Sequence, residues 1–536
     1  MASDPVPILL VTANVGSIFE DPSVMLKIWT KEFLETVIRL KPKFLALHCQ
    51  EVGGKNYEES MQHVEYFVQF LMESDELKVF DKVRIYLDED YSSAENFTAL
   101  GNFYFIHESI SDVLMWDFEE CCFIAVEGKE IFAGNIENVS SKEKSKFPQD
   151  FFPECKWSRK GFQRTRWNLN GTVFDLINIH LFHDASNFVA MEAFPSVYSK
   201  TRQRALEYTL DRFHNDKHGT APFFLFGDFN FRTDTKGVIK KLSEGLNEVK
   251  VENGKNCKLE YKDSSSQVVF SVGKKEFSHF KHQSVFAEEP WLKEFDREME
   301  DFCGQLFEFP IAFPPSYPFV EDSNVSADYM QTRCPAWCDR VVLSQTAKPL
   351  ISSNHEDKVE YSLIGINSCM GDHKPVYLTG YLTSGAGRLS CCDTYPKTNP
   401  DNETVLFDLG PVESENQEDL GTIAEIGPIP TPLTERFIVK RVHSASIVEV
   451  KVGLVKVNSC RGNDSWRTRS CSVSGVKPPL RAFSKMRLIS SEASLTRVQS
   501  HHSSSSEEWF EEEEPPSSRP SISSKKKHRK RCCVVI

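Results

Sequence analysis

Four short apolar segments of this sequence each run directly into polar residues, and this pattern limits the possible folds more than any other feature. The segments are 6–13 (VPILLVTA), 43–49 (KFLALHC), 171–181 (GTVFDLINIHL) and 222–226 (PFFLF), and the polar residues that end them are Asn14, Glu51, His180, Asp228 and Asn230. Apolar runs of this length, bounded by turn residues, are typical of buried strands. One such polar residue alone would simply end a strand. Five of these types together favour a functional site at the carboxyl ends of packed strands.

Helices are predicted between these strands. After Asp21-Pro22, a reasonable helix start, apolar residues recur at helical spacing until Pro42, namely Met25, Ile28, Trp29, Phe33 and Val37. Further elements are predicted over 197–213 (helix), 340–343 and 375–379 (strands). Because the 40 Phe residues are concentrated in the first 320 positions, we expect the core there. The sequence therefore predicts an α/β domain over residues 1–384.

The composition changes after residue 384. Residues 385–524 are rich in Ser, Glu, Pro and Arg and poor in aromatic residues. Such a segment cannot bury enough apolar surface to offset its folding entropy, so we predict a long disordered extension. Only the stretch 436–457 is more apolar and is compatible with a hairpin, which the sequence does not place in the fold. Residues 525–536 form a separate tail.

Composition also excludes several classes of protein. The net charge of −14 argues against a nucleic-acid partner, which needs a broad basic surface, but not against a small anionic substrate in a local pocket. No stretch approaches the roughly 20 apolar residues of a transmembrane helix. The N-terminus lacks the basic region of a signal peptide. The 15 Cys residues are scattered without zinc-site spacing, so we expect reduced cytosolic thiols.

The residue types at the strand ends suit hydrolysis of a phosphate ester. This reaction needs a hard cation, an activated water and donors for the charge that develops on the phosphoryl oxygens. Mg²⁺ binds few carboxylates and keeps several waters, so an isolated Glu51 with Asn14 as outer support would suit it. Asp228 and Asn230 alternate across a strand end and point the same way, so together they could hold a water. Taken alone, this Gly-Asp-x-Asn pattern equally fits an Asx turn.

Three motifs connect the sequence to a known family. They are Phe226-Gly227-Asp228-Phe229-Asn230-Phe231-Arg232, Pro335-Ala336-Trp337-Cys338-Asp339-Arg340 and Asp372-His373-Lys374-Pro375-Val376. The set resembles the inositol polyphosphate 5-phosphatases of the endonuclease/exonuclease/phosphatase superfamily. The resemblance implies a four-layered α/β sandwich of the DNase I-like kind, followed here by the disordered extension. It also implies a phosphoric monoester hydrolase with Mg²⁺ as cofactor.

Further segments resemble the type I enzymes of this family. They are 158–162 (SRKGF), 164–167 (RTRW), 313–318 (FPPSYP) and 532–535 (CCVV). Type I enzymes act on soluble inositol 1,4,5-trisphosphate and inositol 1,3,4,5-tetrakisphosphate, so the resemblance implies removal of their 5-phosphate and an end to calcium-mobilising signals. It covers about residues 7–383 and the last few residues. Position 371 is Gly where the family usually has Ser, and Leu225-Phe226 stands where most members have Trp; neither change removes a catalytic group.

The resemblance implies a role for each site residue. Glu51 would bind Mg²⁺, with Asn14 nearby. Asp228 would orient and deprotonate the attacking water, and Asn230 would help to hold it. The residues that would serve the phosphoryl group are His180 and His373, which would bind its oxygens, Asp372, which would orient His373 through a ring N–H, and Asp339, which would brace the site. The candidates for contacts to the substrate's other phosphates are Lys160, Arg333, Lys374 and Tyr329, with Arg340 beside them as an anchor of the loop.

Each of these residues has a simpler interpretation. Without the motifs, His180 would more readily be a core histidine, and Arg164 and Arg166 a solvated strand face. Cys338 lacks the Cys-x₅-Arg loop of covalent phosphatases, so a mechanism based on metal and water is favoured over a cysteine nucleophile.

The C-terminal tail predicts a membrane anchor. Residues 525–531 (KKKHRKR) carry six Lys or Arg and precede Cys532 and the C-a-a-X box Cys533-Val534-Val535-Ile536. A prenyl group on Cys533, added by a prenyltransferase, and a basic run provide the two signals that stable anchoring requires, with palmitoylation of Cys532 as a further option. We therefore expect the protein at the cytoplasmic face of the plasma membrane and partly in the cytosol, bound to anionic lipid. The alternative is a nuclear-localisation cluster.

Three other functions stay open at this stage. The same scaffold serves nucleases, although the acidic charge and the prenyl box argue against one. A membrane tether would equally suit a lipid 5-phosphatase that acts on phosphatidylinositol 4,5-bisphosphate. A catalytically inactive inositol-phosphate binding module is the third, although intact Glu51, Asp228, Asn230 and His373 argue against it.

Overall fold

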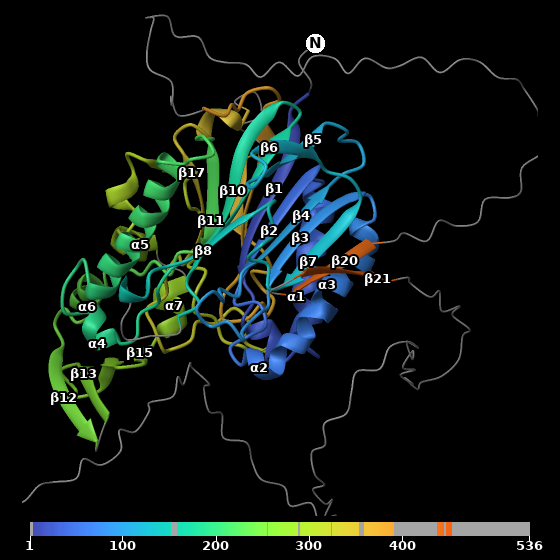
Figure 1. Ribbon diagram of the computed structural model, residues 1–536. Helices are drawn as coiled ribbons and strands as arrows, with labels where there is room; N and C mark the ends of the chain where they lie inside the picture. The colour runs from blue at the N-terminus through green and yellow to red at the C-terminus, as the bar shows by residue number, and fades with distance from the viewer. Residues whose placement is uncertain are drawn as a thin grey trace, which may run out of the picture. The chain divides into compact units, whose positions relative to one another are not determined.

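Two large mixed β-sheets face each other in the computed structural model of the chain (Figure 1). The structure describes residues 4–151, 158–253, 256–287, 290–322, 324–352, 359–390, 437–443 and 446–452. The tail with Cys532 and Cys533 lies outside these residues, as does most of the 385–524 extension.

The first sheet has nine strands and contains the N-terminal strand of the chain near its middle. Its order is β18 (Glu360–Leu363), β19 (Val376–Leu382), β1 (Val6–Asn14), β2 (Phe44–Gln50), β4 (Gly101–Ile106), β3 (Lys82–Asp88), β7 (Lys129–Gly134), β20 (Phe437–His443) and β21 (Ser446–Val452). β1 and β2 are parallel, whereas β1 and β19 are antiparallel.

The second sheet has eight strands, and a third, smaller sheet has four. The second sheet runs β16 (Leu306–Glu308), β17 (Asp339–Ser344), β11 (Phe223–Asp228), β10 (Thr172–His180), β9 (Gly161–Leu169), β5 (Val113–Asp117) and β6 (Cys122–Ala125), with β8 (Glu143–Lys146) paired to β9. The small sheet runs β12 (Asn247–Asn253), β13 (Asn256–Lys262), β14 (Val268–Gly273) and β15 (Glu276–His279).

Helices cover the outer faces of both large sheets. The α-helices are α1 (Met25–Leu40), α2 (Tyr57–Ser60), α3 (Val64–Glu73), α4 (Asn187–Ala190), α5 (Val197–His214), α6 (Thr235–Leu242) and α7 (His282–Ala287). One buried cluster lies between the sheets, a second between the nine-stranded sheet and α1 with α3, and a third between the eight-stranded sheet and α5. The four-layered α/β sandwich is therefore confirmed. Each layer has its own apolar interface, and burial of that surface is the main stabilising term.

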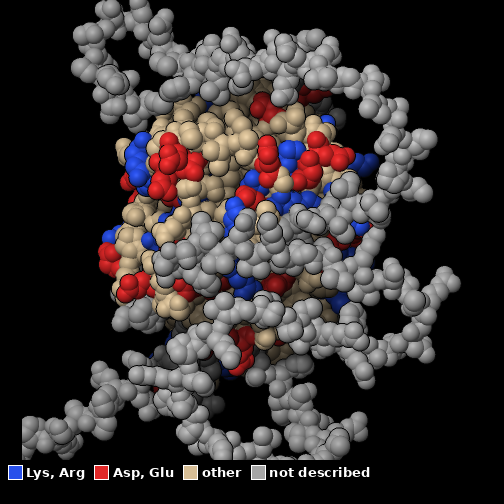
Figure 2. Space-filling view, turned by 45° about the vertical axis from the view of Figure 1, so that its right-hand side comes forward, with Lys and Arg blue, Asp and Glu red and all other residues tan. Residues whose placement is uncertain are grey.

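Most predicted elements lie where the sequence indicated. The helix predicted from Asp21-Pro22 begins later, at Met25, and ends at Leu40, with Lys41 in the left-handed conformation (φ 48°) directly before Pro42. Within the described part of the chain, no helix is both long and apolar enough to cross a membrane. Acidic and basic side chains are interspersed on the face shown in Figure 2.

A hairpin from the extension joins the edge of the nine-stranded sheet. β20 pairs in parallel with β7, and β21 pairs antiparallel with β20. Val439 packs against the core cluster beneath the sheet, and Lys440 Nζ lies 2.6 Å from Glu130 Oε1. For these two strands the prediction of disorder was wrong, because β20 pairs with β7 and β21 pairs with β20. The hairpin that the sequence allowed within residues 436–457 agrees with the observed pairing of β20 and β21.

Candidate active site

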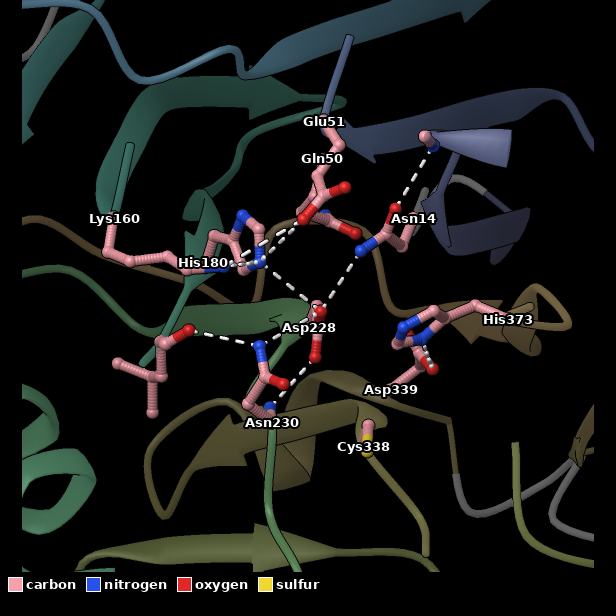
Figure 3. Close-up of polar contacts among 12 residues, drawn as sticks. Asn14, Gln50, Glu51, Lys160, His180, Asp228, Asn230, Cys338, Asp339 and His373 are labelled. Carbon is pink, nitrogen blue, oxygen red and sulfur yellow. Dashed lines mark hydrogen bonds and ion pairs between the residues drawn. The ribbon is translucent and has the colours of Figure 1, made fainter. Parts of the chain in front are cut away.

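The polar residues that end the strands meet at one edge of the sandwich (Figure 3). Asn14 and Gln50 are partners in the parallel β1–β2 pair, and His180 and Asp228 are partners in the parallel β10–β11 pair. Asp339 begins β17, which runs antiparallel to β11, and lies opposite Asp228. The expected clustering is therefore confirmed. It arises because two parallel pairs, one in each sheet, end at the same place.

Asp228 is the centre of the cluster. Its Oδ2 accepts hydrogen bonds from Nδ2 of Asn14 (3.2 Å) and Nδ2 of Asn230 (3.1 Å), and its Oδ1 accepts one from the backbone N–H of Asn230 (2.8 Å). Nε2 of His180 lies 3.3 Å from the same Oδ2. All four side chains are at least 95% buried. A buried carboxylate with this many donors is held in one orientation.

Asn230 has an unusual backbone and a fully engaged side chain. Its φ is 51°, in the left-handed region that Asn tolerates better than most residues. Its Nδ2 also donates to the carbonyl of Leu181 (3.0 Å), and its Oδ1 accepts from Nη2 of Arg232 (2.6 Å). The amide orientation is therefore determined on both sides.

Glu51 is the best candidate for a magnesium ligand. Its carboxylate lies 3.9 Å from Nη2 of Arg159, 3.9 Å from Nζ of Lys160 and 3.8 Å from Nε2 of His180, which is longer than a hydrogen bond in each case. A Cβ built at Gly16 would lie 2.6 Å from Oε2 of Glu51 and 3.3 Å from Oδ1 of Asn14. Glycine therefore leaves space beside two oxygen ligands, and hard oxygen ligands are those that Mg²⁺ prefers.

A second group of ligands is a weaker candidate. Asp228, Asp339 and His373 each offer one atom, and these atoms lie within 4.8 Å of one another. Nδ1 of His373, however, lies only 2.8 Å from Oδ2 of Asp339 and is engaged there. Imidazole is also a poor ligand for Mg²⁺. We therefore favour Glu51 as the metal ligand and interpret the His373 group as an acid–base pair.

His373 is oriented by Asp339 and not by Asp372. Oδ2 of Asp339 accepts from Nδ1 of His373 (2.8 Å) and from Oγ of Ser316 (2.8 Å). Asp372 instead accepts from Oγ of Ser17 (2.7 Å) and lies 3.4 Å from Nζ of Lys55. The role predicted for Asp372 was therefore wrong. Asp372 and His373 lie in a bend before β19, and the carboxylate of Asp372 is held by Ser17 and Lys55 instead.

The buried charges shift the pKa values of the site in opposite directions. Burial alone would raise the pKa of Asp228, but the neighbouring His373, His180 and Lys160 outweigh burial and hold it far below its usual range. Burial would lower the pKa of His373, but Asp339 and Asp228 raise it to about 9. At neutral pH the site thus contains an ionised Asp228 and a protonated His373, which is a hydrogen-bond donor on both nitrogens.

His180 is held as the neutral imidazole. Burial lowers its pKa, and the charge of Lys160 lowers it further, against the opposing effects of Asp228 and Glu51. Nζ of Lys160 contacts Nε2 of His180, which a neutral ring can accept. Lys160 is only 7% exposed, and it lies beside His180 and Glu51 at the catalytic centre. A contact to the substrate's other phosphates would be expected at the edge of the site, whereas Lys160 lies at its centre.

Three further predicted substrate contacts were wrong. Nζ of Lys374 donates to the carbonyls of Ser326, Gly365 and Ser368, and the side chain is fully buried. Tyr329 is 2% exposed and donates to the carbonyl of Pro315. Arg340 is ion-paired with Asp296 and Glu308 and anchors its loop through the carbonyl of Trp337, as the anchoring role predicted, so it cannot reach substrate.

Arg333 is partly buried and donates to backbone carbonyls. Its Nη1 donates to the carbonyl of Lys274 (3.1 Å), and its Nη2 donates to the carbonyl of Asp184 (3.2 Å). It therefore remains a candidate for a substrate contact. Within the described residues, it is the one member of the predicted set that is only partly buried and forms no ion pair.

Sequence reasoning missed several residues that support the site. Arg159 donates to the carbonyl of Gly54 and lies beside Glu51, and Ser316 holds Asp339. The ring of Tyr317 lies between His373 (4.5 Å) and the guanidinium of Arg232 (4.3 Å). The strand alternation at Asp228, Asn230 and Arg232 was the signal that could have indicated the last of these.

Two simpler interpretations were also tested by the structure. Arg164 and Arg166 are fully buried and bind Asp175 and Asp216, so they are not a solvated strand face. Cys338 is fully buried, and burial raises the pKa of its thiol well above the usual value. A thiol of this kind is not a nucleophile.

Comparison with known proteins places the chain in a family. Residues 121–379 match the model of Endonuclease/Exonuclease/phosphatase family 2. The chain is 50% identical over 390 residues to inositol polyphosphate-5-phosphatase A of Rattus norvegicus and of Homo sapiens, which covers 71% of this chain and 94% of each relative. The chain belongs to the inositol polyphosphate 5-phosphatase family. It is thus a phosphatase, and the cluster around Asp228 is the candidate for its active site.

More distant relatives agree with this assignment. A probable type I inositol 1,4,5-trisphosphate 5-phosphatase of Caenorhabditis elegans is 36% identical over 409 residues, which covers 69% of this chain and 98% of the relative. Among solved structures, the inositol polyphosphate 5-phosphatase domain of SPsynaptojanin, in complex with inositol (1,4)-bisphosphate and calcium ion, has a TM-score of 0.40 at 16% identity. It covers 72% of this chain and 85% of its own, and a similarity at this score adds nothing to the family assignment.

Proposed function

We propose that this protein removes the 5-phosphate of inositol 1,4,5-trisphosphate and inositol 1,3,4,5-tetrakisphosphate with Mg²⁺ as cofactor, and so ends calcium-mobilising signals. The observation that carries the proposal is the division of charge around Asp228. An ionised carboxylate, a protonated His373 and an oxygen-ligand site at Glu51 lie together at one sheet edge. The relatives named inositol polyphosphate-5-phosphatase A and type I inositol 1,4,5-trisphosphate 5-phosphatase support the substrate class.

Each group has a defined part in the reaction. Glu51, with Asn14, would hold Mg²⁺, which when bound neutralises phosphoryl charge and polarises the ester. Asp228 accepts a hydrogen bond from the attacking water and orients it. Because its pKa is held low, orientation suits it better than the full proton abstraction expected from the sequence. Asn230 holds the Asp228 carboxylate in place, because its backbone N–H donates to Oδ1 and its Nδ2 donates to Oδ2.

The phosphoryl group needs donors as its charge changes. Protonated His373, held by Asp339, donates to a phosphoryl oxygen, and Lys160 supplies a second positive charge beside His180. Arg333 is the remaining candidate for one of the other phosphates. This arrangement favours in-line attack by water over a covalent intermediate, because the one buried thiol nearby, Cys338, is un-ionised.

Phosphate release by the full chain tests the proposal. We expect Mg²⁺-dependent release from inositol 1,4,5-trisphosphate, and little from phosphatidylinositol 4,5-bisphosphate in vesicles. Asp228→Ala should abolish release, whereas Asp211→Ala, an exposed carboxylate on α5, should not change it. Equal or faster cleavage of the lipid would overturn the substrate, and full activity of Asp228→Ala would overturn the mechanism. Binding of the soluble substrate without any turnover would identify an inactive binding module instead.

We also propose that a prenyl group on Cys533 and the basic run 525–531 anchor the protein to anionic membrane at the cytoplasmic face of the plasma membrane. The support is the sequence of the tail alone. In cells fed a labelled isoprenoid, the wild type and Cys532→Ser should incorporate the label, and Cys533→Ser should not and should move to the cytosol. Unchanged membrane association of Cys533→Ser would overturn the anchor, and accumulation of all three proteins in the nucleus would favour a localisation signal.

A further inference from the structure

A buried arginine close to the catalytic water site lacks the partners that other buried arginines have. Arg232 is 7% exposed, and its Nε and Nη1 are buried without a hydrogen-bond partner among the described residues. Arg202 and Arg340, which are equally buried, each pair with two carboxylates. Leaving a buried donor unpaired is costly, and such groups are concentrated at functional sites.

The contacts that Arg232 does make are to catalytic groups. Its Nη2 donates to Oδ1 of Asn230 (2.6 Å). With that oxygen engaged, the Asn230 amide group must turn its Nδ2 toward Asp228 (3.1 Å) and the Leu181 carbonyl (3.0 Å), as Figure 3 shows. A rotated amide would place two donors against the guanidinium, which would be repulsive.

The other face of the guanidinium reaches the second half of the site. It lies 4.3 Å from the ring centroid of Tyr317, and that ring lies 4.5 Å from the ring of His373. A guanidinium over an aromatic face is held by cation–π attraction, which strengthens when the pair is desolvated. Arg232 therefore connects Asn230 and Asp228 with His373 through a single set of packed contacts.

We propose that Arg232 is a positioning residue, which sets the Asn230 amide and, through Tyr317, the ring of His373, so that the water site and the phosphoryl donor keep one relative geometry. The cost of this arrangement is two guanidinium nitrogens, Nε and Nη1, without a partner among the described residues. A further carboxylate would pair them but would add negative charge beside Asp228. This inference rests on the proposed hydrolysis, because it concerns the geometry of the same site.

Replacement of Arg232 by Lys tests this role, because it keeps the positive charge but removes the planar guanidinium group. Because a misplacement of about 1 Å can cost about 10²-fold in rate, we expect Arg232→Lys to lower kcat by about that factor. KM should change by less than about threefold, since the substrate contacts remain. Arg340→Lys is the matched control: an equally buried arginine that anchors a loop and does not touch Asn230, so its kcat per folded molecule should not change.

A double-mutant cycle separates a positioning role from a structural one. Because Arg232 acts partly through Asn230 and partly through Tyr317, Arg232→Lys should lower kcat clearly less in the Asn230→Ala background than in the wild type, and the loss that remains is expected from the Tyr317 contact. Additive losses, a change confined to KM, or an equal kcat loss in Arg340→Lys would overturn the proposal. The same cycle measured by urea unfolding reports the coupling of the two residues without any substrate. It therefore distinguishes failure of this inference from failure of the proposed reaction.

Discussion

Replacement of Asp216 by Asn should destabilise the protein strongly without changing its chemistry. Oδ2 of Asp216 accepts from Nη1 of Arg164 (2.6 Å) and Nη2 of Arg166 (3.0 Å), and all three side chains are fully buried. Asp175 completes the network on the other side of both guanidinium groups. Asn keeps the size of Asp216 but removes its charge, which leaves the two buried cations with Asp175 and with Glu143, whose side chain is partly exposed and contacts only Arg164 of this pair.

The magnitude follows from the pKa of Asp216. Burial would raise this pKa, but Arg164 and the other donors outweigh burial and lower it from 3.8 to about 2. The difference is about 2 pKa units, which corresponds to roughly 2–3 kcal/mol of stability. Removal of one partner from a buried pair typically costs about 3–5 kcal/mol. We therefore expect Asp216→Asn to lower the free energy of unfolding by about 2–4 kcal/mol at pH 7.

The loss should depend on pH in one direction. Because the pKa of Asp216 is lower in the folded state, its contribution is present above the unfolded value near 3.8 and is lost as the pH falls through 2. About half of this contribution should remain at pH 3. Urea unfolding of both proteins at pH 7, 5 and 3 measures the difference directly. A difference below about 1 kcal/mol at pH 7, or one that grows toward pH 3, would refute the electrostatic reasoning.

Three further outcomes are expected. Gly227→Ala should prevent stable folding, because a Cβ there would lie 1.9 Å from the carbonyl oxygen of Ile179 on β10; a soluble, fully active variant in activity and thermal-unfolding assays would contradict the pairing of β10 with β11. Lys374→Met should lower the melting temperature and change KM for the soluble substrate by less than about twofold, because the ammonium faces three backbone carbonyls; a large rise in KM would restore its role as a substrate contact. Arg441→Glu should weaken the pairing of β20 with β7, because Nη2 of Arg441 lies 3.4 Å from Oε2 of Glu65, and hydrogen exchange in β7 should become faster. The reversed pair, Arg441→Glu with Glu65→Arg, should restore protection. If it does not, this ion pair does not stabilise the docked hairpin.

Much of the site could be predicted because it is built at strand ends. Asn14 and Asp228 follow mainly apolar runs, Glu51 follows a short apolar strand, and His180 ends a segment that alternates as a strand should; such patterns are the primary local signal in a sequence. Parallel pairing then brings their ends together without any further information. The same logic predicted the four layers, since each apolar face needs a covering layer.

The errors came from residues whose roles depend on distant parts of the chain. The family resemblance implied Asp372 as the partner of His373, but the partner in the structure, Asp339, is 34 residues away. Lys374 was expected to contact substrate, but its ammonium donates to three backbone carbonyls. Both residues lie in the irregular segment before β19, where side-chain directions depend on the surrounding loops and not on a local pattern. The docking of β20 on β7 needs contacts across about 300 residues, which local patterns do not reveal.

The buried arginines of this fold differ in whether a carboxylate neutralises their charge. Arg164, Arg166, Arg202 and Arg340 are fully buried, and each is matched by carboxylates that are themselves buried, so these networks hold strands and loops in place at little net cost. Within the described residues, the side chain of Arg232 alone of these five donates to an amide oxygen and forms no ion pair with a carboxylate. Full pairing would stabilise the fold but would also neutralise the positive field beside Asp228. The site therefore keeps an unpaired cation where the reaction accumulates negative charge, and the surrounding networks supply the rigidity that makes this possible.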